Sequence, residues 1–259
     1  MDNTTVFFQG ATERLMGHYS PVHNSEKIAI IFPPHPKSFA TSNNKVVKTI
    51  ARSFFDAGFS TLRPNFRTQD SSGYFNKTSS ISEEELIKDA VAAIDWMQDL
   101  HTSVKEFWIG GFSFGGWLTF NLLMRRPEIT GFISVSPLIN NYDCSFIISS
   151  PSDGLIICGE KDKLISQKDL KKIAIRLNSK NSNIEYLLVK NGKYNLSSEN
   201  ELNTIKQSMD CFLNKKNINI PDCNNQLINR DNTNEAVIEN TLHDDIMEEN
   251  DQELVLDEA

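Results

Sequence analysis

The sequence predicts an α/β fold, with a mostly parallel sheet and helices on both of its faces. Short β-branched and aromatic runs alternate with amphipathic patterns of helical period, as in successive βαβ units. A serine between two glycines lies at the junction of one predicted strand and the next helix, and the excess acidic residues gather near the C-terminal end. These observations predict one domain over residues 1–213 and an acidic tail over 214–259.

The first elements are a hairpin, a strand, a helix and a second strand. Residues 4–20 alternate in character around a turn near Gly10, which indicates an antiparallel hairpin at the sheet edge. The apolar run 27–32 is typical of a buried strand. Apolar residues at helical intervals predict a helix over 45–55, which Gly58 ends, and 59–66 resembles the next strand.

The remaining elements continue the alternation. Ser82 and Glu85 have the spacing of a capping box, so a helix is expected behind them. Further strands are predicted at 106–109, 132–135, 155–158 and 186–189, and further helices at 118–124, 169–177 and 204–213. The connection between Val135 and Leu155 is too short for a lid domain, so we expect an open pocket.

Charge is distributed very unevenly along the 259 residues. The formal net charge is −8, but residues 214–259 alone hold 12 acidic and 3 basic residues, which leaves 1–213 nearly neutral. The tail is poor in apolar residues, so we expect it to be mostly disordered, and it could act as a protein-binding arm or an autoinhibitory segment. The acidic balance argues against nucleic-acid binding.

Other features exclude several protein classes. The chain has no apolar run of about 20 residues, so no membrane span is expected. It begins without the basic and apolar regions of a secretory signal. The four cysteines lack C-x-x-C spacing, which favours reduced thiols over a zinc site. We therefore expect a cytoplasmic protein without a metal or cofactor.

The pentapeptide Gly111-Phe-Ser113-Phe-Gly115 follows a predicted strand and precedes a predicted helix. In a G-x-S-x-G nucleophile elbow, serine occupies a sharp, strained turn, and the amide of the next residue, here Phe114, faces the developing oxyanion. A glycine-rich turn used only for packing is the plain alternative. A dinucleotide-binding loop is disfavoured, because the glycines do not satisfy G-x-G-x-x-G.

With this motif the sequence resembles the α/β-hydrolase superfamily, in a compact bacterial branch related to dienelactone hydrolases and serine aminopeptidase-like hydrolases. The resemblance runs from about Val6 to Leu213. Besides the elbow, it is carried by the segments Pro34-His-Pro36, Asn43-Asn-Lys-Val-Val47, Arg63-x-Asn-Phe-Arg67, Met124-Arg-Arg-Pro-Glu-Ile129 and Gly159-x-Lys-Asp162.

The resemblance implies a triad in the chain order Ser, Asp, His. Ser113 would be the nucleophile and Asp162 the acid. The family pattern places the histidine after the strand at 186–189, but Tyr194 stands there, and no histidine occurs between His101 and His243. Neutral phenol is a poor base at pH 7. The ordinary mechanism therefore needs another base.

The loop after the strand at 27–32 is expected to supply the second oxyanion amide. Pro33, Pro34 and Pro36 have no N–H, so His35 or Lys37 must provide it. His35 could also be a surrogate base, or simply line the pocket, and His243 could reach back from the tail. Two further alternatives stay open for Arg63 and Arg67: they bind an acidic substrate, or they pin the following loop. Residues 68–80 are expected to rim the pocket.

The sequence therefore leaves three hypotheses. The first is a serine hydrolase of ester or related acyl bonds with a degenerate triad. The second is an inactive member of the fold that binds a small molecule or a protein. The third gives the main role to the acidic tail.

Overall fold

The computed structural model describes residues 3–38, 40–67, 81–178 and 182–214. Eight strands form one sheet in the order β1-β2-β4-β3-β5-β6-β7-β8. β1 pairs with β2, and β2 with β4, in antiparallel fashion, whereas all the other neighbours are parallel. The strands are β1 (Thr4–Gln9), β2 (Arg14–Ser20), β3 (Lys27–Phe32), β4 (Ser60–Pro64), β5 (Glu106–Phe112), β6 (Gly131–Val135), β7 (Asp153–Gly159) and β8 (Ile184–Val189).

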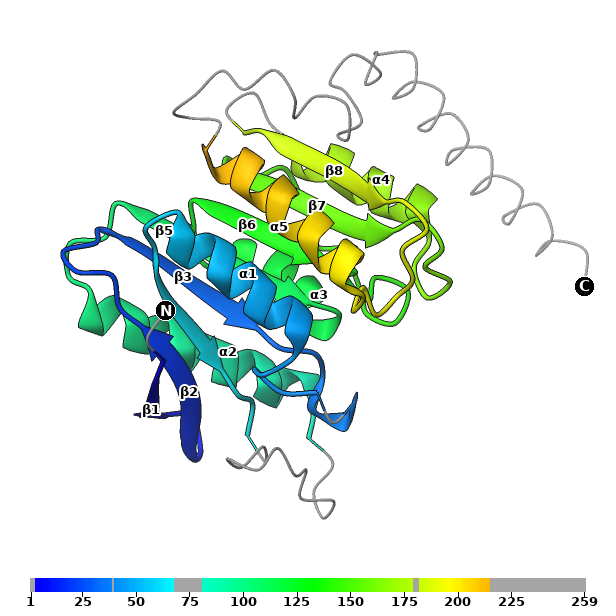
Figure 1. The fold of residues 1–259 in the computed structure, drawn as a ribbon. Helices are drawn as coiled ribbons and strands as arrows, with labels where there is room; N and C mark the ends of the chain where they lie inside the picture. The colour runs from blue at the N-terminus through cyan, green and yellow to red at the C-terminus, as the bar shows by residue number, and fades with distance from the viewer. Residues whose placement is uncertain (1–2, 39, 68–80, 179–181, 215–259) are drawn as a thin grey trace, which may run out of the picture. The chain divides into compact units, whose positions relative to one another are not determined.

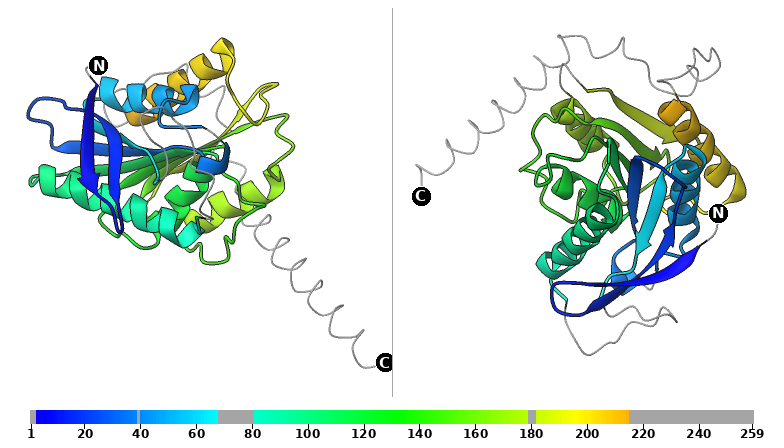
Figure 2. Two further views of the ribbon diagram at one scale, coloured as in Figure 1. Left: turned by 90° about the horizontal axis from the view of Figure 1, so that it is seen from below. Right: turned by 90° about the vertical axis from the view of Figure 1, so that its left-hand side faces the viewer.

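Helices cover both faces of this sheet (Figures 1 and 2). α1 (Lys45–Asp56) and α5 (Glu199–Asn214) pack together on one face. The opposite face carries α2 (Glu83–Leu100), α3 (Phe114–Leu123) and α4 (Gln167–Leu177). One short 3-10 helix, η1 (Pro36–Ser38), follows β3.

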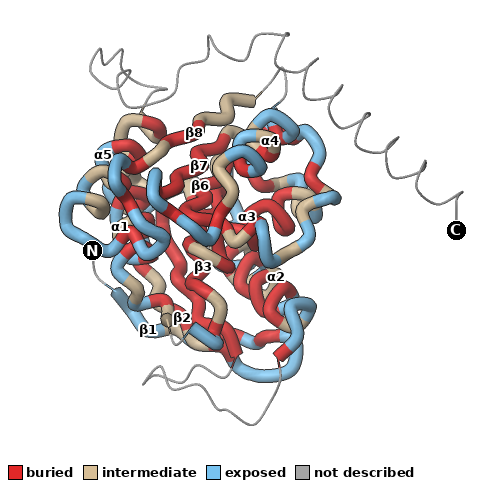
Figure 3. Tube along the Cα trace, turned by 90° about the vertical axis from the view of Figure 1, so that its right-hand side faces the viewer, coloured by how far each residue is buried: buried red, intermediate tan, exposed pale blue. Residues whose placement is uncertain are grey.

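The sheet separates two apolar cores. Successive side chains of β3 point alternately into one core and the other. Ile28, Ile30 and Phe32 contribute to the core under α2, α3 and α4. Ala29 and Ile31 point the other way, into the core under α1 and α5. A strand buried on both faces is expected to be apolar at every position. The central strands are accordingly buried along most of their length (Figure 3).

Side-chain caps fix where two of the helices begin. Asn44 Oδ1 accepts hydrogen bonds from the amides of Val46 and Val47 at 2.9 and 3.4 Å at the start of α1. At the start of α2, Ser82 and Glu85 form the predicted reciprocal capping box. Each cap satisfies amides that have no partner inside the helix.

The structure confirms the predicted α/β fold and every predicted element within it. The N-terminal hairpin is antiparallel and lies at the sheet edge. The connection between β6 and β7 forms turns and coil without a helix or strand, so no lid domain is inserted there. The tail beyond Asn214, with His243, and the segment 68–80 lie outside the described residues, and the predictions made for them stay predictions.

Three further observations concern the described residues alone. None of their helices combines the length and apolar character needed to cross a membrane. They contain no group of three His, Cys, Asp or Glu side chains placed to hold a metal ion. Cys144 and Cys158 are free, whereas Cys211 is disulfide-bonded, so the expectation of reduced thiols is wrong at Cys211.

Candidate active site

Ser113 lies in a sharp turn between β5 and α3. Its φ of 59° and ψ of −116° are strained for a residue with a side chain, and it caps α3 without a side-chain hydrogen bond to the helix. Gly111 and Gly115, on either side of Ser113, leave no room for a side chain because backbone atoms lie close to them. A Cβ on Gly111 would lie 2.0 Å from the carbonyl oxygen of Gly115, and one on Gly115 would lie 2.3 Å from that of Phe32. Backbone atoms cannot give way as side chains can, so this turn has the geometry of a nucleophile elbow.

Ser113, Asp162 and Tyr194 line one cavity of about 240 Å³. They come from three loops at the carboxyl edge of the parallel strands, after β5, β7 and β8. The topology therefore brings together residues that are far apart in sequence, in the place where open α/β sheets bind ligands.

Asp162 is buried, with 7% of its surface exposed. Its Oδ1 accepts a hydrogen bond from the amide of Leu164 at 2.9 Å, and its Oδ2 lies 4.0 Å from the thiol of Cys158. Burial raises the pKa of Asp162, and the Leu164 amide and the nearby Ser136 hydroxyl offset part of this rise. No Lys, Arg or His of the described residues forms an ion pair with this carboxylate.

Tyr194 reaches the cavity because the loop after β8 is bonded to the loop after β7. The amides of Glu160 and Lys161 donate to the carbonyl oxygens of Val189 and Gly192 at 3.0 and 2.8 Å. The Tyr194 side chain is 55% exposed. A phenol thus lies in the loop where the family resemblance implies an imidazole, and no histidine of the described residues lines the cavity.

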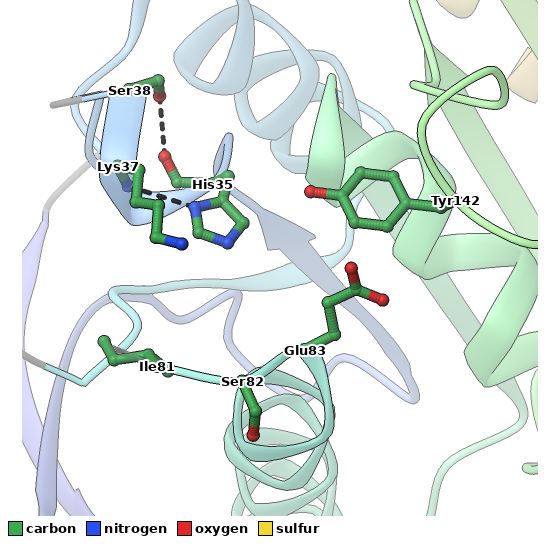
Figure 4. Close-up of a pocket in the computed structure, with 7 residues that line it drawn as sticks. All are labelled: His35, Lys37, Ser38, Ile81, Ser82, Glu83 and Tyr142. Atoms are coloured by element: carbon green, nitrogen blue, oxygen red, sulfur yellow. Dashed lines mark hydrogen bonds between the residues drawn. The ribbon is translucent and has the colours of Figure 1, made fainter. Parts of the chain in front are cut away.

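The backbone amides predicted to bind the oxyanion differ in whether they already donate a hydrogen bond to another group. Phe114 is the first residue of α3, so its amide has no acceptor within the helix. The Lys37 amide donates instead to His35 Nδ1 at 3.1 Å (Figure 4). Of these two residues, only His35 therefore has a backbone amide without an acceptor among the described residues, so it is the amide in this loop that can bind an oxyanion.

The His35 ring does not line the cavity of Ser113. It lines a separate open groove, where Glu83 and Tyr142 face it (Figure 4). The ring packs edge-on against Phe114, with 5.0 Å between the ring centroids. Burial, together with the neighbouring Lys37 charge, lowers the pKa of His35. These contacts favour a packing role over that of a surrogate base.

Arg63 in β4 and Arg67, three residues after this strand, have structural roles. Arg67 donates from Nη2 to Asp89 Oδ1 at 2.6 Å and from Nε to Asp89 Oδ2 at 3.0 Å, and it also pairs with Glu85. Arg63 is 2% exposed and donates to the carbonyl oxygen of Ser42 at 2.7 Å. Both pin neighbouring segments, and neither lines the cavity of Ser113.

Sequence reasoning missed Ser136, which follows β6 and lines the cavity. It has a φ of 42° and is 2% exposed, and its hydroxyl stabilises the charged form of Asp162, although it forms no hydrogen bond of standard geometry with the described residues. Its position after the strand beside β5 could have identified it, because that strand ends next to the elbow.

Comparison with known proteins identifies the family of this chain. The model of the dienelactone hydrolase family matches residues 25–190, a range that includes Ser113 and Asp162. An uncharacterised protein of Rickettsia prowazekii is 36% identical over 185 residues, which cover 70% of this chain and 76% of that protein.

Solved structures show the same fold. The crystal structure of a protein of unknown function from Agrobacterium tumefaciens, described as a putative α/β hydrolase, has 34% identity and a TM-score of 0.72, and the match covers 84% of this chain and 100% of that one. An α/β serine hydrolase without a lid from Xanthomonas campestris has a TM-score of 0.68 at 16% identity, covering 85% and 97%. The extent of the family match and these relatives show that the chain belongs to the dienelactone hydrolase family.

Proposed function

We propose that the protein hydrolyses ester or related acyl bonds, with Ser113 as the nucleophile. The observation that carries this proposal is the strained turn at Ser113, which opens into the same cavity as Asp162. Strain of this kind persists where the surrounding structure maintains it, and it is frequent at catalytic positions. The Phe114 amide and an amide of the His35 loop bind the oxyanion, and Asp162 orients a base.

The triad in this proposal is degenerate, because Tyr194 occupies the loop of the histidine. Loss of the base in a subtilisin-type triad costs on the order of 10⁶ in kcat and leaves about 10³–10⁴ over the reaction in water. We therefore expect turnover far below that of a complete triad, unless a base comes from elsewhere.

Labelling with a fluorophosphonate probe tests the nucleophile. The full chain is incubated with the probe between pH 6 and 9, and the modified residue is identified by mass spectrometry. We expect slow labelling at Ser113 that is absent from Ser113→Ala. Ser145→Ala, on an exposed loop outside the cavity, is the matched control and should label like the wild type. Absence of Ser113 labelling at every pH would reject the proposal.

The second candidate is an inactive member of the fold that binds a ligand or a protein. The lack of histidine in the cavity lining favours it. Tyr194→His discriminates between the two. If wild type turns over no ester while Tyr194→His gains a rate that Asp162→Asn removes, the wild type is a binding protein that kept the remaining parts of the site. Wild-type turnover that Ser113→Ala removes would contradict this candidate.

A further inference from the structure

Asp162 is a buried carboxylate without a cationic partner among the described residues. It contacts the Leu164 amide at 2.9 Å and the Cys158 thiol at 4.0 Å, and the neutral Ser136 hydroxyl also stabilises its charged form. Burial and the neighbouring Asp162 charge raise the pKa of that thiol to about 12, so it stays neutral. A carboxylate withdrawn from water without a cation is costly, and such groups are normally paired.

The cavity beside Asp162 lacks positive charge as well. Among the residues that the structure describes, its lining includes no Lys, Arg or His, and Asp162 is the only carboxylate. The Ser136 hydroxyl, which is 2% exposed and lies close enough to Asp162 to stabilise its charged form, adds a polar group to the same cavity. The Tyr194 ring adds an aromatic group, of the kind that attracts cations. Each of these features favours a ligand that brings a positive charge or an N–H donor.

We propose that the cavity binds a ligand with a protonatable nitrogen, an imidazole or an amine, which sits between Asp162 and Ser113 and takes the place of the absent histidine. The cavity of about 240 Å³ is somewhat smaller than the roughly 300–1,000 Å³ of pockets for drug-sized ligands, so the nitrogen belongs to a small group. The binding site stands on Asp162 and Ser136 alone, whereas its catalytic use rests on the hydrolase function proposed above.

The ligand nitrogen supplies the proton transfers that Tyr194 cannot. The neutral nitrogen takes the Ser113 Oγ proton while Oγ bonds to the acyl carbon, and the Asp162 carboxylate stabilises the cation that forms. The tetrahedral intermediate then breaks its bond to the ester oxygen, which takes the proton from the nitrogen and leaves as an alcohol. The same nitrogen next deprotonates water, which attacks the acyl group. It finally returns that proton to Ser113 Oγ as the acid departs.

Imidazole itself is the probe for this proposal. The rate of Ser113 labelling by a fluorophosphonate is measured at rising imidazole concentration, and binding is followed separately by saturation-transfer NMR of imidazole. We expect the labelling rate to rise at least fivefold and to saturate. The imidazole NMR signal should depend on Asp162 and be lost in Asp162→Asn. The matched control Asp99→Asn removes an equal charge from an exposed position on α2, and it should behave as the wild type.

The outcomes separate this proposal from the hydrolase function. A labelling rate that rises linearly, equally in wild type and Asp162→Asn, would mean that imidazole acts from bulk solution, and it would overturn the ligand site while the nucleophile stands. Asp162-dependent imidazole binding without any Ser113 labelling would support the site and reject the hydrolase. Absence of imidazole binding in the wild type would also overturn the site. Circular dichroism of Asp162→Asn verifies that this variant is folded.

Discussion

At the scale of single residues, Asp162 is buried and has no cationic partner among the described residues, which should reduce stability at neutral pH. Because burial raises its pKa above the ordinary 3.8, the folded protein binds this proton more tightly than the unfolded chain. The contribution of Asp162 to stability is therefore largest below pH 3.8, falls as the pH rises from there through the raised value, and stays lower above it. Asp162→Asn, which keeps an oxygen for the Leu164 amide, escapes this loss.

We therefore expect Asp162→Asn to increase the free energy of unfolding at pH 7 by roughly 1 kcal/mol, within the range of single stabilising substitutions. The gain should shrink towards pH 4. Urea denaturation of wild type and variant at both pH values measures it, with Asp99→Asn as the control for loss of an exposed charge. A variant that is less stable than the wild type at pH 7 would mean that Asp162 has a stabilising partner.

Single residues also mark the limit of what the sequence could predict. Ser113 was identifiable because its glycine neighbours encode a particular turn, and Asp162 because it follows a strand in the expected chain order. Ser136 has no local pattern, since its importance arises only from the pairing of β6 with β5. The hydrogen bond from the Lys37 amide to the His35 ring depends on a side-chain rotamer, which spacing does not encode.

At the scale of elements, the sequence patterns predicted every α-helix and strand described, with errors confined to their ends, and missed only the short 3-10 helix η1. The helix expected over 118–124 begins at Phe114, because the glycines of the elbow are part of its first turn. The helix expected over 204–213 begins at Glu199, in a polar stretch without an apolar period. Burial produces the apolar pattern, so exposed helical turns leave little trace in it.

The link between β4 and α2 allows a test of element packing. Arg67 is 6% and Asp89 1% exposed at the side chain, and Asp89 also accepts the Arg67 amide at 3.0 Å. Asp89→Asn leaves the guanidinium buried with only Glu85 as a charged partner, so we expect a loss of about 3 kcal/mol in the free energy of unfolding. Lys88→Gln breaks an exposed ion pair on the same helix and should cost below about 0.5 kcal/mol. Equal losses in urea denaturation would contradict this assignment.

At the scale of the whole molecule, the excess negative charge and the residues of the proposed active site belong to different parts of the sequence. Residues 228–259 hold 11 acidic residues and 1 basic residue, so truncation after Leu227 changes the formal charge from −8 to +2 and keeps all four cysteines. Because the lining residues of the cavity lie between Pro34 and Ser197, well before the truncation, we expect the labelling rate of Ser113 to stay within twofold of the full chain.

The same truncation should change colloidal behaviour, because net charge keeps proteins soluble and sets their non-specific binding. We expect the truncated chain to pass through an anion-exchange column that retains the full chain at pH 7, and to unfold in urea within about 0.5 kcal/mol of it. A large loss of stability would show that residues beyond Leu227 belong to the folded domain. A faster Ser113 labelling rate at unchanged stability would instead identify the acidic segment as an inhibitor of the site, since only a segment that hinders access to the cavity raises that rate when it is removed.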